Sequence, residues 1–175
     1  MEELLEAIKD DRIAVVKKLL AKNEIDLSQI VYFGDEYELE EPEETNILFY
    51  SIRTYASIEI IKLLVEAGVD IFQTTKEGVG AIDIAIKFKR EDVVQLCIDS
   101  GIDINISKRK SKITPIILAS CFNNISMVEL LINNGANINA VDNSKMSAKD
   151  YAKKLGQNKM LDFLDSIGAE FNLYR

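Results

Sequence analysis

Apolar residues recur in this chain in a fixed pattern that ends each time at a glycine. The glycines are spaced by 33, 34 and 33 residues, and they are Gly68, Gly101, Gly135 and Gly168. Before Gly68 the apolar positions follow the order i, i+1, i+3, i+4, at Ile60, Ile61, Leu63 and Leu64. This order places the side chains on one face of a helix, and glycine ends a helix because it adopts the left-handed conformation without a Cβ clash. The pattern predicts four similar helices that each stop at a glycine.

In each unit, a shorter helix comes before the helix that ends at the glycine. It is clearest at Thr114 and Pro115, where the threonine is expected to cap the helix and the proline to occupy its first position. Matching small residues, which allow neighbouring helices to approach closely, are Ala85, Ala119 and Ala152. After each glycine comes a short extended stretch followed by polar residues. Each unit is therefore predicted as helix, turn, helix and a hairpin-like finger.

The residues Thr114–Ala140 resemble an ankyrin repeat over most of the unit. Gly80–Asn105 and Ser147–Asn172 resemble further ankyrin repeats at the same offset, and Thr45–Phe72 resembles another with two extra residues between its helices. Residues 4–20 resemble a first, capping repeat. The resemblance spans almost the whole chain in about five units, 1–44, 45–79, 80–113, 114–146 and 147–175.

Two departures from the family pattern stand out. The glycine that ends the second helix is missing from the first unit, at Asn23–Ile25. The histidine that often follows the threonine-proline start is also missing, and the residues in its place are Leu48, Asp83, Ile117 and Asp150.

The resemblance implies an all-α solenoid, here one domain over residues 1–175, that binds a protein partner and performs no chemistry. The expected contact surface comprises the finger tips and the exposed side of the first helices. Aligning these helices gives two rows of positions. One row is Lys9, Ile52, Lys87, Cys121 and Lys154, and the next is Asp10, Arg53, Phe88, Phe122 and Leu155. From these rows, the predicted partner-binding residues are Arg53, Lys87, Phe88, Cys121, Phe122 and Leu155. The alternative is that the two rings simply pack between repeats.

The first connection, Ser28–Glu44, is about nine residues longer than its counterparts. Its residues 35–44 contain seven acidic side chains and no basic one. The flanking stretches 30–33 and 37–39 are predicted to form a two-stranded finger that turns near Gly34. Six further partner-binding residues are predicted here: Tyr32, Phe33, Tyr37, Glu38, Glu40 and Glu41. They suit a basic or mixed basic and apolar protein surface. The alternative is an acidic loop that only faces solvent, and its spacing does not match a calcium loop.

The composition narrows the function classes. The formal net charge of −8 argues against nucleic acid as a partner, and the absence of histidine removes the usual general base and the commonest zinc ligand. Cys97 and Cys121 form no paired motif, so we expect a reducing compartment, and no apolar run is long enough to cross a bilayer. We therefore predict a cytoplasmic, monomeric protein without cofactor, metal or membrane partner. The basic tip at residues 108–112 is expected to be solvated.

Three functions remain to be distinguished. The first is an adaptor or inhibitor that holds one protein partner. The second is a sharper form of the first, an immunity-type protein that neutralises a toxin or effector. The last is an enzyme that uses paired carboxylates such as Asp83 and Asp150. Both carboxylates fall near helix starts, where acidic side chains accept hydrogen bonds from free backbone amides, so capping is the favoured interpretation.

Overall fold

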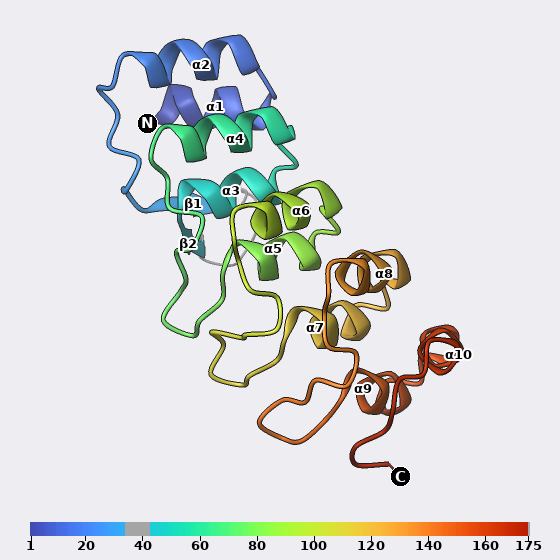
Figure 1. Cartoon of the computed structure of the whole chain (residues 1–175). Coiled ribbons are helices and arrows are strands. Elements are labelled where there is room, and N and C mark those ends of the chain that lie inside the picture. Colours follow the sequence, from blue (N-terminus) through green and yellow to red (C-terminus); the bar gives the residue numbers. More distant parts are fainter. Residues whose placement is uncertain (34–42, 175) are drawn as a thin grey trace. The chain divides into compact units, whose positions relative to one another are not determined.

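The computed structural model describes residues 1–33 and 43–174 (Figure 1). In these residues, ten helices form five antiparallel pairs, one in each predicted repeat. The chain separates into two compact units, residues 1–71 and 72–175, which we call unit 1 and unit 2. Unit 1 contains α1 (Glu2–Lys9), α2 (Ile13–Ala21), β1 (Val31–Phe33), β2 (Glu43–Thr45), α3 (Ile47–Arg53) and α4 (Ile58–Glu66). Unit 2 contains α5 (Ala81–Lys87), α6 (Glu91–Asp99), α7 (Pro115–Cys121), α8 (Ile125–Asn133), α9 (Ala148–Lys154) and α10 (Asn158–Ser166).

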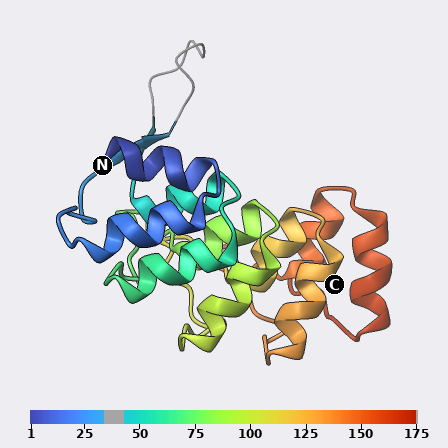
Figure 2. The ribbon, with the colours of Figure 1, turned by 90° about the horizontal axis from the view of Figure 1, so that it is seen from above.

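In unit 2 the first helices of successive repeats stack on one another. Helix α7 packs against both α5 and α9, and each of the three packs against its own second helix (Figures 1 and 2). The predicted small residues Ala85, Ala119 and Ala152 are fully buried in this stack. Their size explains how the stacked backbones approach so closely. We call α5, α7 and α9 the inner helices of unit 2, and α6, α8 and α10 the outer helices.

The predicted helix stops are confirmed. Gly68, Gly101, Gly135 and Gly168 all have φ between +77° and +100°, just after the second helix of their pair. In the first repeat, Asn23 takes the same role with φ +54°. Asparagine tolerates the left-handed conformation better than most residues, so the missing glycine does not change the fold.

The turn inside each helix pair contains a left-handed residue that the sequence did not indicate. The residues are Asp11, Tyr55, Lys89, Asn123 and Gly156, with φ from +52° to +67°. At Tyr55 and Lys89 this conformation costs about 1–2 kcal/mol each, because the side chain crowds the backbone. Helix packing on both sides therefore imposes the turn.

The three inner helices of unit 2 differ in the hydrogen bonds that cap their N-termini. Ser147 and Asp150 form a reciprocal capping box, and Asp83 accepts a hydrogen bond from the Gly80 amide at 2.8 Å. Thr114 and Pro115 stand at the predicted positions of α7, but the predicted hydrogen bond of the Thr114 side chain is absent. Its buried hydroxyl has no partner among the described residues.

The predicted two-stranded finger exists, but its second strand differs from the prediction. β1 pairs in antiparallel register with β2, so that Val31 lies opposite Thr45 and Tyr32 opposite Glu44. The residues predicted as the second strand, 37–39, lie outside the described part of the chain. Val31 is buried, and Thr45 directly precedes the cap of α3, so the hairpin closes where the chain enters the helix.

Candidate partner-binding surface

Exposed apolar side chains mark the same position in successive repeats of unit 2. Phe88, Phe122 and Leu155 are the C-cap residues of the three inner helices. Phe122 is 40% exposed and Leu155 51% exposed, whereas Phe88 is half-buried. Because the inner helices stack, these three residues form a row. With the preceding residues Lys87, Cys121 and Lys154, we call it the inner rim.

Electrostatic contacts place the inner rim beside the fingers of unit 2. Burial and the nearby carboxylate of Asp142 raise the pKa of Cys121 to about 11, although the charges of Arg109 and Lys154 oppose the shift. Asp142 and Arg109 belong to two successive fingers, and Lys154 belongs to the next inner helix. The Cys121 thiol therefore lies within electrostatic reach of both fingers and of the next inner helix.

Asp142, the finger residue whose charge acts on Cys121, is buried. The Tyr151 hydroxyl donates a hydrogen bond to Asp142 Oδ2 at 2.7 Å, and the Met146 amide donates to the other oxygen at 2.9 Å. Burial, followed by the hydrogen bond and charge of Asp142, raises the pKa of Tyr151 to about 12. The pair links the fourth finger to α9. Sequence reasoning missed it, because the two residues stand nine positions apart without a motif.

The basic tip at residues 108–112 was predicted to face solvent, and Arg109 contradicts this prediction. Its Nε donates to Asp83 Oδ1 at 2.7 Å, so the guanidinium ties the third finger to the start of α5. Asp83 is buried, and its other oxygen caps the helix. The neighbours Lys108, Lys110 and Lys112 are exposed as expected. A carboxylate in place of the family's histidine explains why an arginine can bind here.

The fingers of unit 2 also join to one another through backbone atoms. The Lys110 amide donates to the Glu77 carbonyl at 3.1 Å, and the Asn143 amide donates to the Ser111 carbonyl at 2.9 Å. Away from the finger tips, the Asn105 side-chain amide also donates to the Gly135 carbonyl at 3.0 Å. Successive finger tips therefore form one continuous edge in unit 2.

Arg53 was predicted in the row of Phe88, but the structure places it in the row of Lys87. Helix α3 begins after Asn46, whose side chain accepts a hydrogen bond from the Phe49 amide, so the cap is one residue later than Thr45, with which the repeat was aligned. Arg53 is consequently equivalent to Lys87, and Ile52 is fully buried. The Arg53 side chain is also largely buried, and its guanidinium makes two hydrogen bonds to Glu43 at 2.7 and 2.9 Å. It holds β2 against α3.

The hairpin of unit 1 exposes one of its predicted anchors. Tyr32 is 59% exposed and lies opposite Glu44, and the preceding Ile30 is also exposed. The backbone of Phe33 lies in β1. Four predicted residues, Tyr37, Glu38, Glu40 and Glu41, lie outside the described residues.

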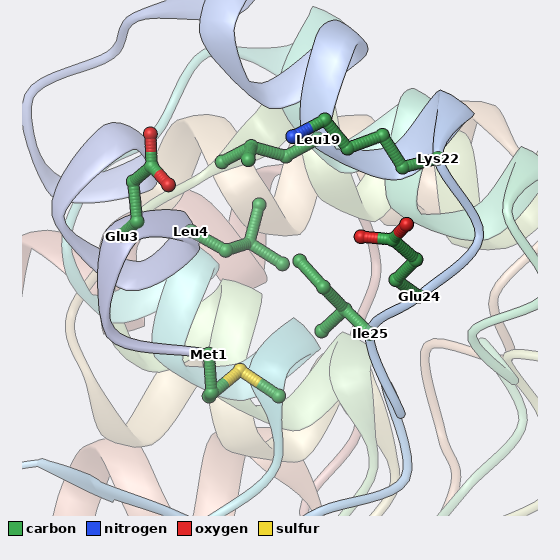
Figure 3. A pocket seen from close by; sticks show the side chains of 7 residues that line it. All are labelled: Met1, Glu3, Leu4, Leu19, Lys22, Glu24 and Ile25. Atoms are coloured by element: carbon green, nitrogen blue, oxygen red, sulfur yellow. The ribbon is translucent and has the colours of Figure 1, made fainter.

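Unit 1 also contains a small open cavity of about 240 Å³ between α1 and the end of α2 (Figure 3). Leu4, Leu19 and Ile25 point into it, and charged side chains surround them. Within residues 1–33 and 43–174, no group of three or more acidic or cysteine side chains is arranged to hold a metal ion, and no helix is long and apolar enough to cross a bilayer.

Comparisons with known proteins agree with this architecture. A family model described as ankyrin repeats (many copies) matches residues 82–132. The B-cell lymphoma 3 protein homolog of Mus musculus is 33% identical over 105 residues, which are 60% of this chain and 23% of that protein. A putative ankyrin repeat protein of fowlpox virus (strain NVSL) is 44% identical over 57 residues, 32% of this chain and 17% of that protein. A putative ankyrin repeat protein of Acanthamoeba polyphaga mimivirus is 26% identical over 107 residues, 61% of this chain and 14% of that protein. The chain thus spans less than a quarter of the length of each of these relatives.

Proposed function

Because the chain is an ankyrin-repeat protein, we propose that it acts as a non-catalytic scaffold that holds another protein against its inner rim and fingers. Ankyrin repeats are protein–protein interaction modules. The observation that carries the proposal is the row of apolar side chains at one position of three successive repeats, of which Phe122 and Leu155 are exposed and Phe88 is half-buried. A regular row of this kind has no role in the core of unit 2.

Large apolar side chains of this row are unfavourable when they face water. Phe122 and Leu155 are large side chains that could be buried by a partner, and burial of such a side chain contributes about 1.5–3 kcal/mol. Aromatic and long aliphatic residues surrounded by polar groups are typical anchors of protein interfaces. The lysines beside them supply the polar border.

The acidic segment of unit 1 supplies a second contact in this proposal. Residues 35–44 carry seven carboxylates, and the hairpin that leads into them presents Tyr32 beside Glu44. Carboxylates next to an exposed ring suit arginine and lysine side chains of a partner. We propose that this segment meets a basic region of the bound protein.

The carboxylate-enzyme alternative finds no support in the geometry. Asp83 accepts hydrogen bonds from Gly80 and Arg109, and Asp150 accepts them from four backbone amides and the Ser147 hydroxyl. Both carboxylates therefore act as structural acceptors. A general acid or base needs a proton-transfer partner that these bonds do not leave open.

A comparative affinity experiment tests the proposal. The wild-type chain, the double variant Phe122→Ala with Leu155→Ala, and the control Ile167→Ala are immobilised and exposed to an extract of the native source. Ile167 is a matched control because it is 37% exposed and ends an outer helix. We expect a protein that the wild type and the control retain and that the double variant releases. Equal retention by all three forms, or retention by none, would contradict the proposal.

A further inference from the structure

The two units carry opposite charge. Unit 1 contains 17 acidic and 7 basic residues, a formal net charge of −10, whereas unit 2 contains 12 acidic and 14 basic residues, a net charge of +2. The acidity of the whole chain therefore belongs to unit 1. Unit 2, which contains the inner rim, needs a separate electrostatic description.

Exposed lysines of unit 2 gather on the edge where a partner is proposed to bind. Each of three successive finger tips presents at least one of them, Lys76, Lys110 and Lys145, and the inner rim adds Lys87 and Lys154. The finger tips are contiguous, since their backbones are hydrogen-bonded to one another. Lys154 lies within electrostatic reach of Cys121, together with the finger residue Arg109. We call these five lysines the basic face.

Most exposed acidic side chains of unit 2 lie elsewhere. The outer helices carry Glu91, Asp92, Asp99, Glu129, Asp162 and Asp165, all exposed. The acids near the basic face are largely neutralised or buried: Asp83 pairs with Arg109, and Asp142 is buried under Tyr151. Three further exposed acids lie outside the outer helices: Glu77, Asp103 and Glu170. Unit 2 thus carries most of its exposed acids on the outer helices, away from the basic face.

We infer that the basic face, with Phe122 and Leu155 between its lysines, binds an acidic protein segment that also carries apolar side chains. The inference rests on the proposed function and adds the chemistry of the partner at this surface. Complementary charge favours a segment rich in Asp and Glu, and the exposed apolar pair provides burial for its Leu, Ile or Phe residues. It differs from the basic surface proposed for the acidic segment of unit 1.

Nucleic acid is the other polyanion that a lysine cluster attracts, and the observations favour it less. Unit 2 carries only two net positive charges, and unit 1 adds ten negative charges that repel a long phosphate chain. The one arginine of the finger tips, Arg109, is committed to Asp83. A short acidic peptide engages the local cluster without facing the whole chain.

The test uses fluorescence anisotropy with the full chain and three labelled probes. Two are 16-residue peptides with the same Leu and Phe positions, one with Glu and the other with Lys at its remaining positions. The third is a 16-nucleotide single-stranded DNA. We expect the Glu peptide to bind at least about tenfold more tightly than the DNA at low salt, and to weaken as salt screens the charges. The Lys peptide suits the acidic segment of unit 1, so its binding should not depend on the basic face.

Charge-reversal variants of equal net charge locate the effect. Lys110→Glu with Lys154→Glu is expected to weaken binding of the Glu peptide by about tenfold or more. The control, Lys62→Glu with Lys159→Glu, changes two exposed lysines of second helices and is expected to bind as the wild type does. Preference for DNA over the Glu peptide, equal weakening of Glu-peptide binding by both double variants, or no binding of the Glu peptide would overturn the inference. The proposed function fails separately, if the Phe122→Ala with Leu155→Ala variant retains the native partner.

Discussion

Gly78 provides the sharpest test of how the fingers of unit 2 are joined. It has φ +83°, and a Cβ atom added there would lie 2.0 Å from the Lys108 carbonyl oxygen of the next finger. Gly101 has φ +94°, and an added Cβ meets nothing within 4 Å. Replacing each glycine by alanine therefore imposes a similar backbone strain, but only Gly78→Ala also forces two fingers apart.

The expected magnitudes follow from these two contributions. The left-handed conformation costs alanine about 1–2 kcal/mol, which lowers the free energy of unfolding of both variants. At Gly78, overpacking against a neighbouring backbone adds about 1–3 kcal/mol. Loss of the hydrogen bond from the Lys110 amide to the Glu77 carbonyl adds about 1 kcal/mol. Gly78→Ala should therefore be about 2–4 kcal/mol less stable than Gly101→Ala.

Urea unfolding followed by circular dichroism measures this difference in the full chain. Amide exchange adds a local readout, because the Lys110 amide should lose protection in Gly78→Ala and keep it in Gly101→Ala. If the two variants lost the same stability, or if Lys110 stayed protected in both, the close approach of the fingers would be refuted.

Three further predictions concern helix turns, the last repeat and the thiols. Lys89→Gly should raise the free energy of unfolding by about 0.5–1 kcal/mol, because glycine relieves the left-handed strain at φ +57°; unchanged or lower stability in urea would argue against that turn. Burial would raise the pKa of Asp150, but hydrogen bonds from Ser147, Asn172 and Tyr174 outweigh it and lower the pKa. The contribution of the Asp150 carboxylate to the free energy of unfolding is therefore complete above the unfolded pKa of about 3.9, and it is lost as pH falls through the folded pKa. Asp150→Asn should flatten this acid loss and speed amide exchange at residues 172–174, and an unchanged pH profile would contradict the role. Burial raises the pKa of Cys97 to about 12 and that of Cys121 to about 11, so iodoacetamide at pH 7.5 should label both thiols only after unfolding, as read by mass spectrometry. Fast labelling of the native protein would show that a thiol is activated.

The fold could be predicted from the sequence because its signal repeats. Four glycines at a constant spacing fix the helix ends, and the apolar residues before them fix the buried faces. The same comparison of equivalent positions indicated Phe122 and Leu155, which the structure leaves exposed. A signal that recurs in several units is little affected by local variation.

Features that occur once were harder to predict. The start of α3 depends on whether Thr45 or Asn46 caps the helix, and both are good capping residues. The choice moved Arg53 into the row of Lys87 and brought it to Glu43. The partner strand of β1 was predicted at 37–39, whereas residues 43–45 pair with it. Burial of Val31 beside the helix, a tertiary effect, decides that register.

The two repeats with an aspartate at the family's histidine position show how a local departure is accommodated. Asp83 and Asp150 both cap their own helix and then accept a hydrogen bond from the segment that follows in the array. For Asp83 this donor is the Arg109 side chain, and for Asp150 it is a run of backbone amides, Asn172, Leu173 and Tyr174. A carboxylate has enough acceptor sites to serve both bonds at once, whereas isoleucine at position 117 can serve neither. The finger that follows α7 is instead held through Asp142 and Tyr151. The third and fourth fingers are therefore each tied to an inner helix through one buried carboxylate, but the junction differs: Asp83 binds the third finger to the inner helix before it, whereas Asp142 binds the fourth finger to the inner helix after it.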